Sequence, residues 1–126
     1  MAGEPLGIIL LAGTHERAHY AFVLASGAAA LGRAVVLFAT NDGCNALCAD
    51  WSGLEGAARD AVIQGRGVAG FAELRDAARE LGVRLIACEA GLAAAAIAPS
   101  ALLAGVERAG VATFFAAVGP GQMLVL

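Results

Sequence analysis

Two uninterrupted apolar segments with a helical segment between them constrain the fold of this chain more than any other feature. Residues 6–12 read LGIILLA and residues 33–40 read RAVVLFAT, and such runs are typical of strands buried on both faces. Between them, Thr14 can cap a helix that continues to Leu31 and stops at Gly32. A strand, a helix and a strand within about 35 residues form a βαβ unit, which predicts parallel pairing with a right-handed crossover.

The rest of the chain predicts further strands and helices of the same kind. Residues 41–43 indicate a turn, and residues 44–69 indicate a glycine-rich loop with one or two short helices. The segments expected after that loop are a helix over 70–81, a strand over 83–87, a short helix over 90–98, a helix from Pro99 to about residue 109, and a final strand over 122–126. Residues 111–118 fit a strand or a helix, and crowding between two other elements favours the helix.

The helix over 70–81 has a clear amphipathic pattern. Its apolar stripe is formed by Phe71, Leu74, Ala78 and Leu81, and Arg75 falls among the charged residues that cover the remaining surface. The alternation of strands and helices predicts a single α/β domain over residues 1–126, with a mostly parallel sheet of four or five strands.

Composition and charge exclude several classes of function. Although 60% of the 126 residues are hydrophobic, the longest apolar stretch contains Glu89 and Pro99, so we expect no membrane span. Glu4 and Pro5 stand where a signal peptide would be basic. The 8 basic residues are scattered and the net charge is −3, which disfavours nucleic-acid binding. An odd count of 3 cysteines favours reduced thiols and a cytoplasmic protein.

Cys88 is the residue most expected to carry chemistry. It directly follows the predicted strand 83–87, and ligands of parallel sheets bind at the carboxyl ends of strands. Backbone N–H groups and a helix start there would stabilise a thiolate, the form that attacks sulfur, carries a persulfide or reacts with peroxide. The neighbouring Glu89 opposes a second negative charge. The alternative is that Cys88 is a small buried apolar residue.

Three segments of the chain resemble the DsrE/DsrF-like family, a sulfur-relay and peroxiredoxin-like group. They are ACEAGL at 87–92, GTHERAHYAFVLASGAAALGRAVVLFAT at 13–40, and GVERAGVATFF at 105–115 followed by QMLVL. The resemblance implies a small three-layer α/β sandwich that forms homo-oligomers. It also implies that Cys88 occupies the position at which some members carry a persulfide, with sulfur donor or acceptor proteins as partners and no cofactor.

Other polar residues are expected around the same edge of the sheet. Cys44 and Cys48 lie in the loop after the second strand, so either could resolve an oxidised Cys88, although local packing is the favoured interpretation. His15 and His19 have the spacing of two metal ligands, but we predict no metal site and expect His15 to stabilise a thiolate across the cleft. The remaining candidate binding residues are Thr14, Asn41, Asp42, Gly43 and Glu89.

Three functions therefore remain open from the sequence. The first is a sulfur-handling protein that carries a persulfide on Cys88. The second is a thiol redox protein in which Cys44 or Cys48 resolves Cys88. The third is a non-catalytic module that binds a small ligand or a partner protein at the strand ends.

Overall fold

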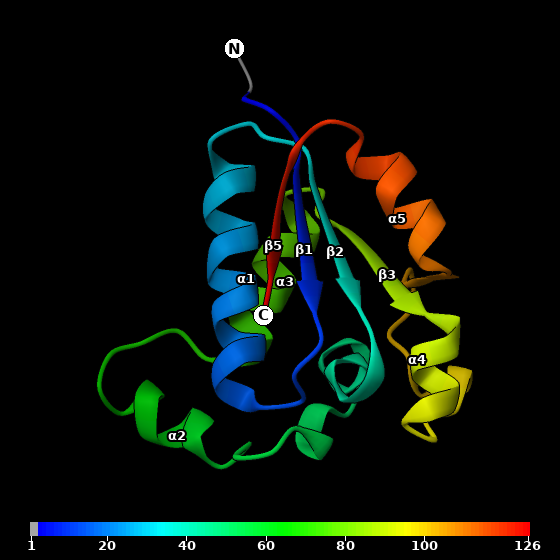
Figure 1. Cartoon of the computed structure of the whole chain (residues 1–126). Helices are drawn as coiled ribbons and strands as arrows, with labels where there is room; N and C mark the ends of the chain where they lie inside the picture. The colour runs from blue at the N-terminus through cyan, green and yellow to red at the C-terminus, as the bar shows by residue number, and fades with distance from the viewer. Residues whose placement is uncertain (1–2) are drawn as a thin grey trace.

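A five-stranded parallel sheet forms the centre of the protein in a computed structural model that describes residues 3–126 (Figure 1). The strands are β1 (Leu6–Leu10), β2 (Val35–Ala39), β3 (Arg84–Cys88), β4 (Glu107–Ala109) and β5 (Gln122–Val125). Their spatial order is β4-β3-β2-β1-β5, and every neighbouring pair is parallel. The predicted parallel α/β fold is confirmed; the first two residues of the expected domain 1–126 lie outside the described residues.

Helices cover the two faces of the sheet unequally. The α-helices are α1 (His15–Ala30), α2 (Arg59–Gln64), α3 (Phe71–Glu80), α4 (Glu89–Ala94) and α5 (Val111–Val118). Three short 3₁₀-helices complete the chain: η1 (Asn41–Leu47), η2 (Trp51–Gly53) and η3 (Pro99–Ala101). Helices α1 and α3 pack together on one face and α5 packs on β1 and β2 from the other face, as Figure 1 shows. The molecule is therefore a three-layer sandwich, and the helix favoured for 111–118 is present.

Each face of the sheet has its own apolar core. The larger core lies under α1 and α3, where the Phe22 and Phe71 rings meet edge to face with centroids 5.5 Å apart. The smaller core lies under α5 and consists of Val36, Phe38, Ile86, Cys88, Phe114 and Val118. Successive side chains of a strand point to opposite faces, so the alternation along β3 places Ala87 in the larger core and Cys88 in the smaller one.

Two predictions near the C-terminus are wrong: one helix is shorter than expected, and another is absent. The helix expected over 90–98 ends at Ala94, and Ala96 has a left-handed φ of 55°. The helix expected from Pro99 to about residue 109 is absent, because η3 stops at Ala101 and residues 107–109 form β4. Gly105 breaks the helical path with a φ of 86°. A three-residue edge strand has too short a pattern to be recognised in the sequence.

The surface pattern of α3 also differs from the prediction at two positions. Leu81 was expected on the buried stripe, but the helix ends at Glu80 and the Leu81 side chain is 48% exposed. Arg75 was expected on the solvent face, but it is buried against η1. The reason is that α3 packs against η1 as well as α1, so the buried sector of the helix is wider than its apolar stripe.

Glycines allow the loops to pack tightly on the carboxyl ends of the strands. A Cβ on Gly43 would overlap the backbone carbonyl of Leu10, and a Cβ on Gly91 would overlap the backbone of Thr40 and Asn41. Hence η1 lies directly on the end of β1, and α4 lies directly on the start of η1. Among residues 3–126, no helix has both the length and the apolar character that crossing a bilayer demands.

We predict opposite effects for the same substitution at two helical glycines. Gly91→Ala should lower the free energy of unfolding by about 1–3 kcal/mol, because backbone atoms block the added methyl group. Gly27→Ala, within α1 and with open space around it, should raise that free energy by about 0.5–1 kcal/mol through helix propensity. Urea unfolding of both variants measures the difference, and a destabilisation no larger at Gly91 than at Gly27 would contradict the packing described here.

Candidate functional site

Cys88 is the last residue of β3 and the N-cap of α4. Its backbone is extended, with φ −67° and ψ 121°, and its Sγ accepts a hydrogen bond from the backbone N–H of Gly91 at 3.3 Å. The residue opposite Cys88 on β4 is Ala109, and Gly110 then caps α5. The Cys88 side chain therefore lies where two helices begin, and it is 9% exposed.

The local sequence explains why the chain turns at this residue. Leu85, Ile86 and Ala87 form a buried strand, and a helix-favouring segment with Glu89 in its first turn follows at once. The N-cap position requires an extended backbone and a side-chain acceptor, which Ser, Thr, Asp or Asn usually provides. Here a thiol takes that role. The side chain that ends the strand is thereby fixed in position by the helix that follows it.

Cys44 lies in η1, on the other side of the sheet from the Cys88 side chain. Its Sγ donates to the carbonyl of Ala39 at 3.5 Å, and it is fully buried in the larger core. Burial, followed by the nearby thiols of Cys88 and Cys48, raises the pKa of Cys44 to about 12, although a hydrogen bond from the Cys88 backbone N–H opposes the rise. Cys44 is therefore a protonated thiol at neutral pH.

Cys48 follows η1 and lines a hollow of about 570 Å³ between that segment and residues 96–101. Its Sγ donates to the carbonyl of Cys44 at 3.5 Å. The pKa of Cys48 is raised overall, because burial and the charge of Asp50 raise it and the positive charge of Arg75 only partly opposes them. Of the two loop cysteines, only Cys48 therefore combines a neighbouring cation with a side open to a hollow.

The other predicted polar residues surround the same end of the sheet. Thr14 caps α1 by accepting from the N–H of Arg17 at 3.3 Å, and Gly43 is buried against β1. Asn41 and Asp42 are exposed, and they begin η1 instead of forming a simple turn. Asn41 has a left-handed φ of 51°. The predicted residue that remains is Glu89, which is exposed.

Glu89 borders a second hollow, beside the residue that carries the thiol. This hollow of about 340 Å³ is also lined by Leu92, Ile97, Pro99 and Arg108. Arg108 belongs to β4, whose backbone pairs with Ala87 immediately before Cys88. A carboxylate and a guanidinium thus lie on the rim of a mostly apolar depression next to the end of β3.

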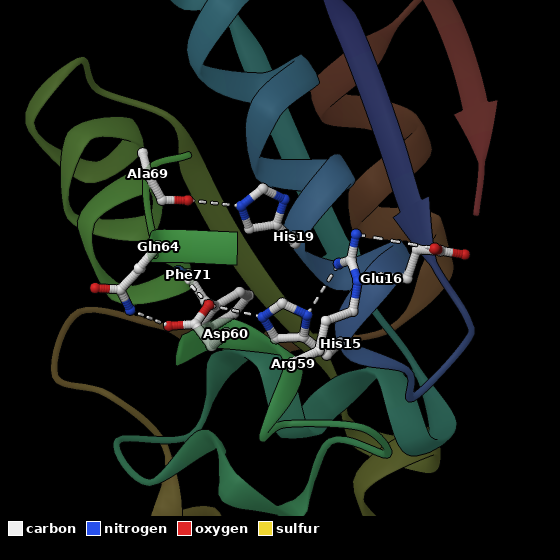
Figure 2. A network of polar contacts seen from close by, with 8 residues as sticks. All are labelled: His15, Glu16, His19, Arg59, Asp60, Gln64, Ala69 and Phe71. Atoms are coloured by element: carbon white, nitrogen blue, oxygen red, sulfur yellow. Dashed lines mark hydrogen bonds and ion pairs between the residues drawn. The ribbon is translucent and has the colours of Figure 1, made fainter. Parts of the chain in front are cut away.

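His15 belongs to a buried polar network and not to the thiol site (Figure 2). Its Nε2 hydrogen-bonds Asp60 Oδ1 at 2.7 Å, and its Nδ1 accepts from Arg59 at 3.3 Å. An arginine N–H can only donate, so in this arrangement Nδ1 accepts from Arg59 and Nε2 donates to Asp60. Both ring nitrogens are therefore occupied within the network, which leaves neither free to face a thiolate as the sequence analysis expected.

The same network joins α1, α2 and α3. Asp60 also accepts from the backbone N–H of Phe71 at 2.8 Å and from Gln64 at 2.7 Å, while His19 Nε2 lies 2.8 Å from the carbonyl of Ala69. Figure 2 shows the two imidazoles side by side on α1, with centroids 5.5 Å apart. In the described part of the chain, no group of three or more His, Cys, Asp or Glu side chains could hold a metal ion.

Sequence reasoning missed the residues that support these positions. Arg59, Asp60 and Gln64 lie in the weakly periodic segment, where no pattern pointed to a helix that meets His15. Arg75 carried a detectable signal, because it lies four residues after Phe71 and therefore on the same side of α3. Its charge led to its assignment to the solvent face.

The buried carboxylate of Asp60 makes stability depend on pH. Burial acts to raise the pKa of Asp60, but hydrogen bonds from His15, Phe71 and Gln64 together hold it below its usual value. A lowered folded-state pKa stabilises the protein above the unfolded-state pKa of about 3.9, and that contribution disappears as the pH falls through the folded-state value.

We predict that Asp60→Asn lowers the free energy of unfolding by about 1–3 kcal/mol at pH 7. Below about pH 4, the free energy of unfolding should decrease less with falling pH in this variant than in the wild type. Urea unfolding from about pH 2.5 to about pH 7, a range that includes the unfolded-state pKa of about 3.9, measures both effects. Glu80→Gln, at an exposed position on α3, is the matched control and should change neither. If the free energy of unfolding depended on pH in the same way in Asp60→Asn and in the wild type, the role assigned to the Asp60 carboxylate would be contradicted.

Comparison with known proteins agrees with this architecture. The crystal structure of the YchN protein from E. coli has a TM-score of 0.68 and 13% identity, covering 98% of this chain and 100% of that one. A protein of unknown function, MTH1491 from Methanobacterium thermoautotrophicum, has a TM-score of 0.59 and 18% identity at the same coverage. No curated protein matches the sequence. The profile of the DsrE/DsrF-like family matches residues 6–125, and the protein therefore belongs to that family.

Proposed function

We propose that this protein carries sulfur as a persulfide on Cys88. The observation that supports the proposal most is the position of Sγ, which ends β3 and accepts the N–H of Gly91 at the start of α4. An anionic sulfur at that point gains a hydrogen-bond donor and the positive end of the helix dipole. The chain belongs to the DsrE/DsrF-like family. The resemblance implies that some members of this family are sulfur-relay proteins, which supports the same chemistry.

The proposed step is an exchange between a thiolate and a sulfane donor. The Cys88 thiolate attacks the outer sulfur of a hydropersulfide R–S–SH, the donor S–S bond breaks, and a new S–S bond forms on Cys88. The proton of the outer sulfur leaves with the departing thiolate, giving R–SH and an anionic persulfide on Cys88. No net oxidation occurs. A second thiol removes the sulfur by the same exchange, so the partners are sulfur donor and acceptor molecules or proteins.

The surroundings of Cys88 suggest where such a partner approaches. The hollow of about 340 Å³ beside α4 begins at Glu89, the residue next to the thiol, and Arg108 borders it from β4. Glu89 repels an incoming sulfur anion, and the positive charge of Arg108 on the rim offsets this repulsion. A protein donor would contact the apolar floor formed by Leu92 and Ile97.

The thiol redox alternative receives less support from the geometry. Cys44 is the nearer loop cysteine to the end of β3, but its pKa of about 12 leaves almost no thiolate for attack on an oxidised Cys88. The Cys44 and Cys88 side chains also belong to different cores, on opposite faces of the sheet.

We also propose that the protein associates with itself through the face that carries α5. Side chains on α5 and β5 leave an apolar surface on that face, because Phe115 is 50% and Val125 is 65% exposed. Val125 pairs with Ile9, which packs in the smaller core, so Val125 points to the same side of the sheet as α5. Large exposed apolar side chains gathered on one face of a protein are typical of an interface.

The sulfur-carrier proposal predicts a specific mass change. Incubation of the wild-type protein with a low-molecular-weight hydropersulfide should add one sulfur atom at Cys88, and a reductant should remove it. Cys88→Ser should lose that adduct at residue 88 while remaining folded, because the serine hydroxyl can accept the same N–H at the N-cap of α4. Intact mass spectrometry with peptide mapping locates the sulfur.

The control for this experiment is Cys44→Ala, which removes a buried thiol without touching the cap and should leave loading at Cys88 unchanged. An adduct at Cys88 that forms in Cys44→Ala and is lost in Cys88→Ser supports the carrier function. A wild-type Cys88 that neither gains sulfur nor reacts with an alkylating reagent in the folded state would overturn it and leave a binding module.

The self-association proposal predicts a change of size. The wild-type protein should elute as an oligomer in size-exclusion chromatography with light scattering, and Val125→Asp should reduce its mass toward that of the monomer, because a charge on the apolar face must be desolvated. Glu73→Gln, at an exposed position on α3, is a control on the opposite face. A monomeric wild-type protein at high concentration would contradict the proposal.

A further inference from the structure

Arg75 is a buried cation that forms no ion pair within residues 3–126, and the charge of Asp76 acts on it only from beyond ion-pair distance. It extends from α3 to the end of η1, where its Nη1 donates to the carbonyls of Ala46 at 2.9 Å and Cys48 at 2.7 Å. Its guanidinium carbon lies 5.3 Å from the centre of the Phe71 ring, and the side chain as a whole is 5% exposed. Within residues 3–126 its Nε has no hydrogen-bond partner, and no carboxylate lies within ion-pair distance.

Binding two carbonyls explains only part of this arrangement. A helix C-terminus attracts positive charge, so Nη1 has a structural role at the end of η1. That role needs one donor group, and burying a charge without an ion-pair partner is unfavourable. Arg75 therefore lacks an ion-pair partner and has an unused Nε donor, in a side chain that binds the carbonyl of Cys48.

Cys48 lies between this cation and solvent-accessible space. On its inner side, the carbonyl of Cys48 accepts the hydrogen bond from Arg75. On its outer side, Cys48 lines the hollow of about 570 Å³, whose walls are mostly small side chains. The carboxylate on this wall belongs to Asp50, which is exposed and engaged by the N–H of Ser52 at 3.0 Å. Cys48 itself is 5% exposed, so the hollow is the side from which a small anionic reagent would approach its thiol, and a buried positive charge lies behind it.

We propose that Cys48 is a second sulfur-accepting thiol, which takes a sulfane sulfur from a small hydropersulfide and holds it as an anionic persulfide beside Arg75. The Cys48 thiolate attacks the outer sulfur of R–S–SH, the donor S–S bond breaks, and the outer proton leaves with R–SH. Arg75 is a positioning residue in this step, because its charge stabilises both the thiolate and the persulfide anion. The proposal shares its chemistry with the function proposed for Cys88 but concerns a separate thiol.

The neighbouring Cys44 provides an internal comparison. Both loop cysteines are buried in the same segment, and burial raises the pKa of each thiol. The charges that act on Cys44 come from the other two thiols and from Asp42. All of them raise its pKa, which reaches about 12. At Cys48 the charge of Arg75 opposes the effect of burial. The pKa of Cys48 is still raised overall, but Cys48 is the loop thiol at which a cation opposes the effect of burial.

Single-thiol variants separate this proposal from the one for Cys88. Cys44→Ala with Cys88→Ser leaves Cys48 alone, and Cys44→Ala with Cys48→Ser leaves Cys88 alone. Each is incubated with glutathione hydropersulfide and analysed by intact mass spectrometry. We expect one reductant-labile sulfur on the variant that retains only Cys48. An adduct on the Cys88-only variant alone overturns the inference and leaves the proposed function intact; no adduct on either overturns both.

The part played by Arg75 has its own readouts. For the variant that retains only Cys48, we measure the ratio of its reaction rate with iodoacetate to its rate with iodoacetamide. We expect this ratio to be several-fold higher than for free glutathione, because a nearby cation attracts the anionic reagent. This measurement leaves Arg75 in place, so it does not depend on a variant folding. A ratio equal to or below that of glutathione would overturn the role of Arg75.

Substitution of Arg75 then tests the direction of the effect. Arg75→Met should move the pH at which sulfur loading reaches half its maximal rate upward by about 1 unit, while Arg75→Lys should largely preserve it. A folded Arg75→Met protein with an unchanged pH profile would show that Arg75 acts only on the end of η1.

Discussion

The contact between η1 and the carboxyl ends of β1 and β3 is the constraint on which the arrangement of the thiols depends. Parallel strands bring their carboxyl ends to one edge of the sheet. A loop backbone can approach that edge this closely only where the contacting residue is a glycine. Gly43 meets the carbonyl of Leu10, and Gly91 meets the backbone of Thr40 and Asn41. These two contacts place a segment with two cysteines beside a strand that ends in a third.

Strand alternation then divides the thiols between two environments. Cys88 points into the smaller core under α5, and Cys44 lies in the larger core under α1 and α3. The two thiols are near enough for Cys88 to raise the pKa of Cys44, but they have different surroundings. One is held by a helix start, one is protonated in an apolar interior, and Cys48 lies between a cation and a hollow.

The sequence was informative where one periodicity dominates and uninformative where contacts are distant. The segments around β1, α1 and β2 were predictable because long apolar runs and a capped helix leave few alternatives. The position of Cys88 at a strand end followed from the same patterns and from the family resemblance. The pairing of His15 with Asp60 joins residues 45 positions apart, and nothing local announces it. Arg75 shows the converse limit, because its charge suggested solvent although its place on α3 faces η1.

The N-cap role of Cys88 has a consequence for how chemistry and fold are inherited. The thiol holds the first turn of α4 through one hydrogen bond, and a serine hydroxyl meets the same requirement. A single-nucleotide change from cysteine to serine would therefore abolish the proposed sulfur chemistry at this position while leaving the scaffold intact. In a lineage built on this scaffold, a member can lose its reactive group and still persist as a well-folded protein, free to acquire another role.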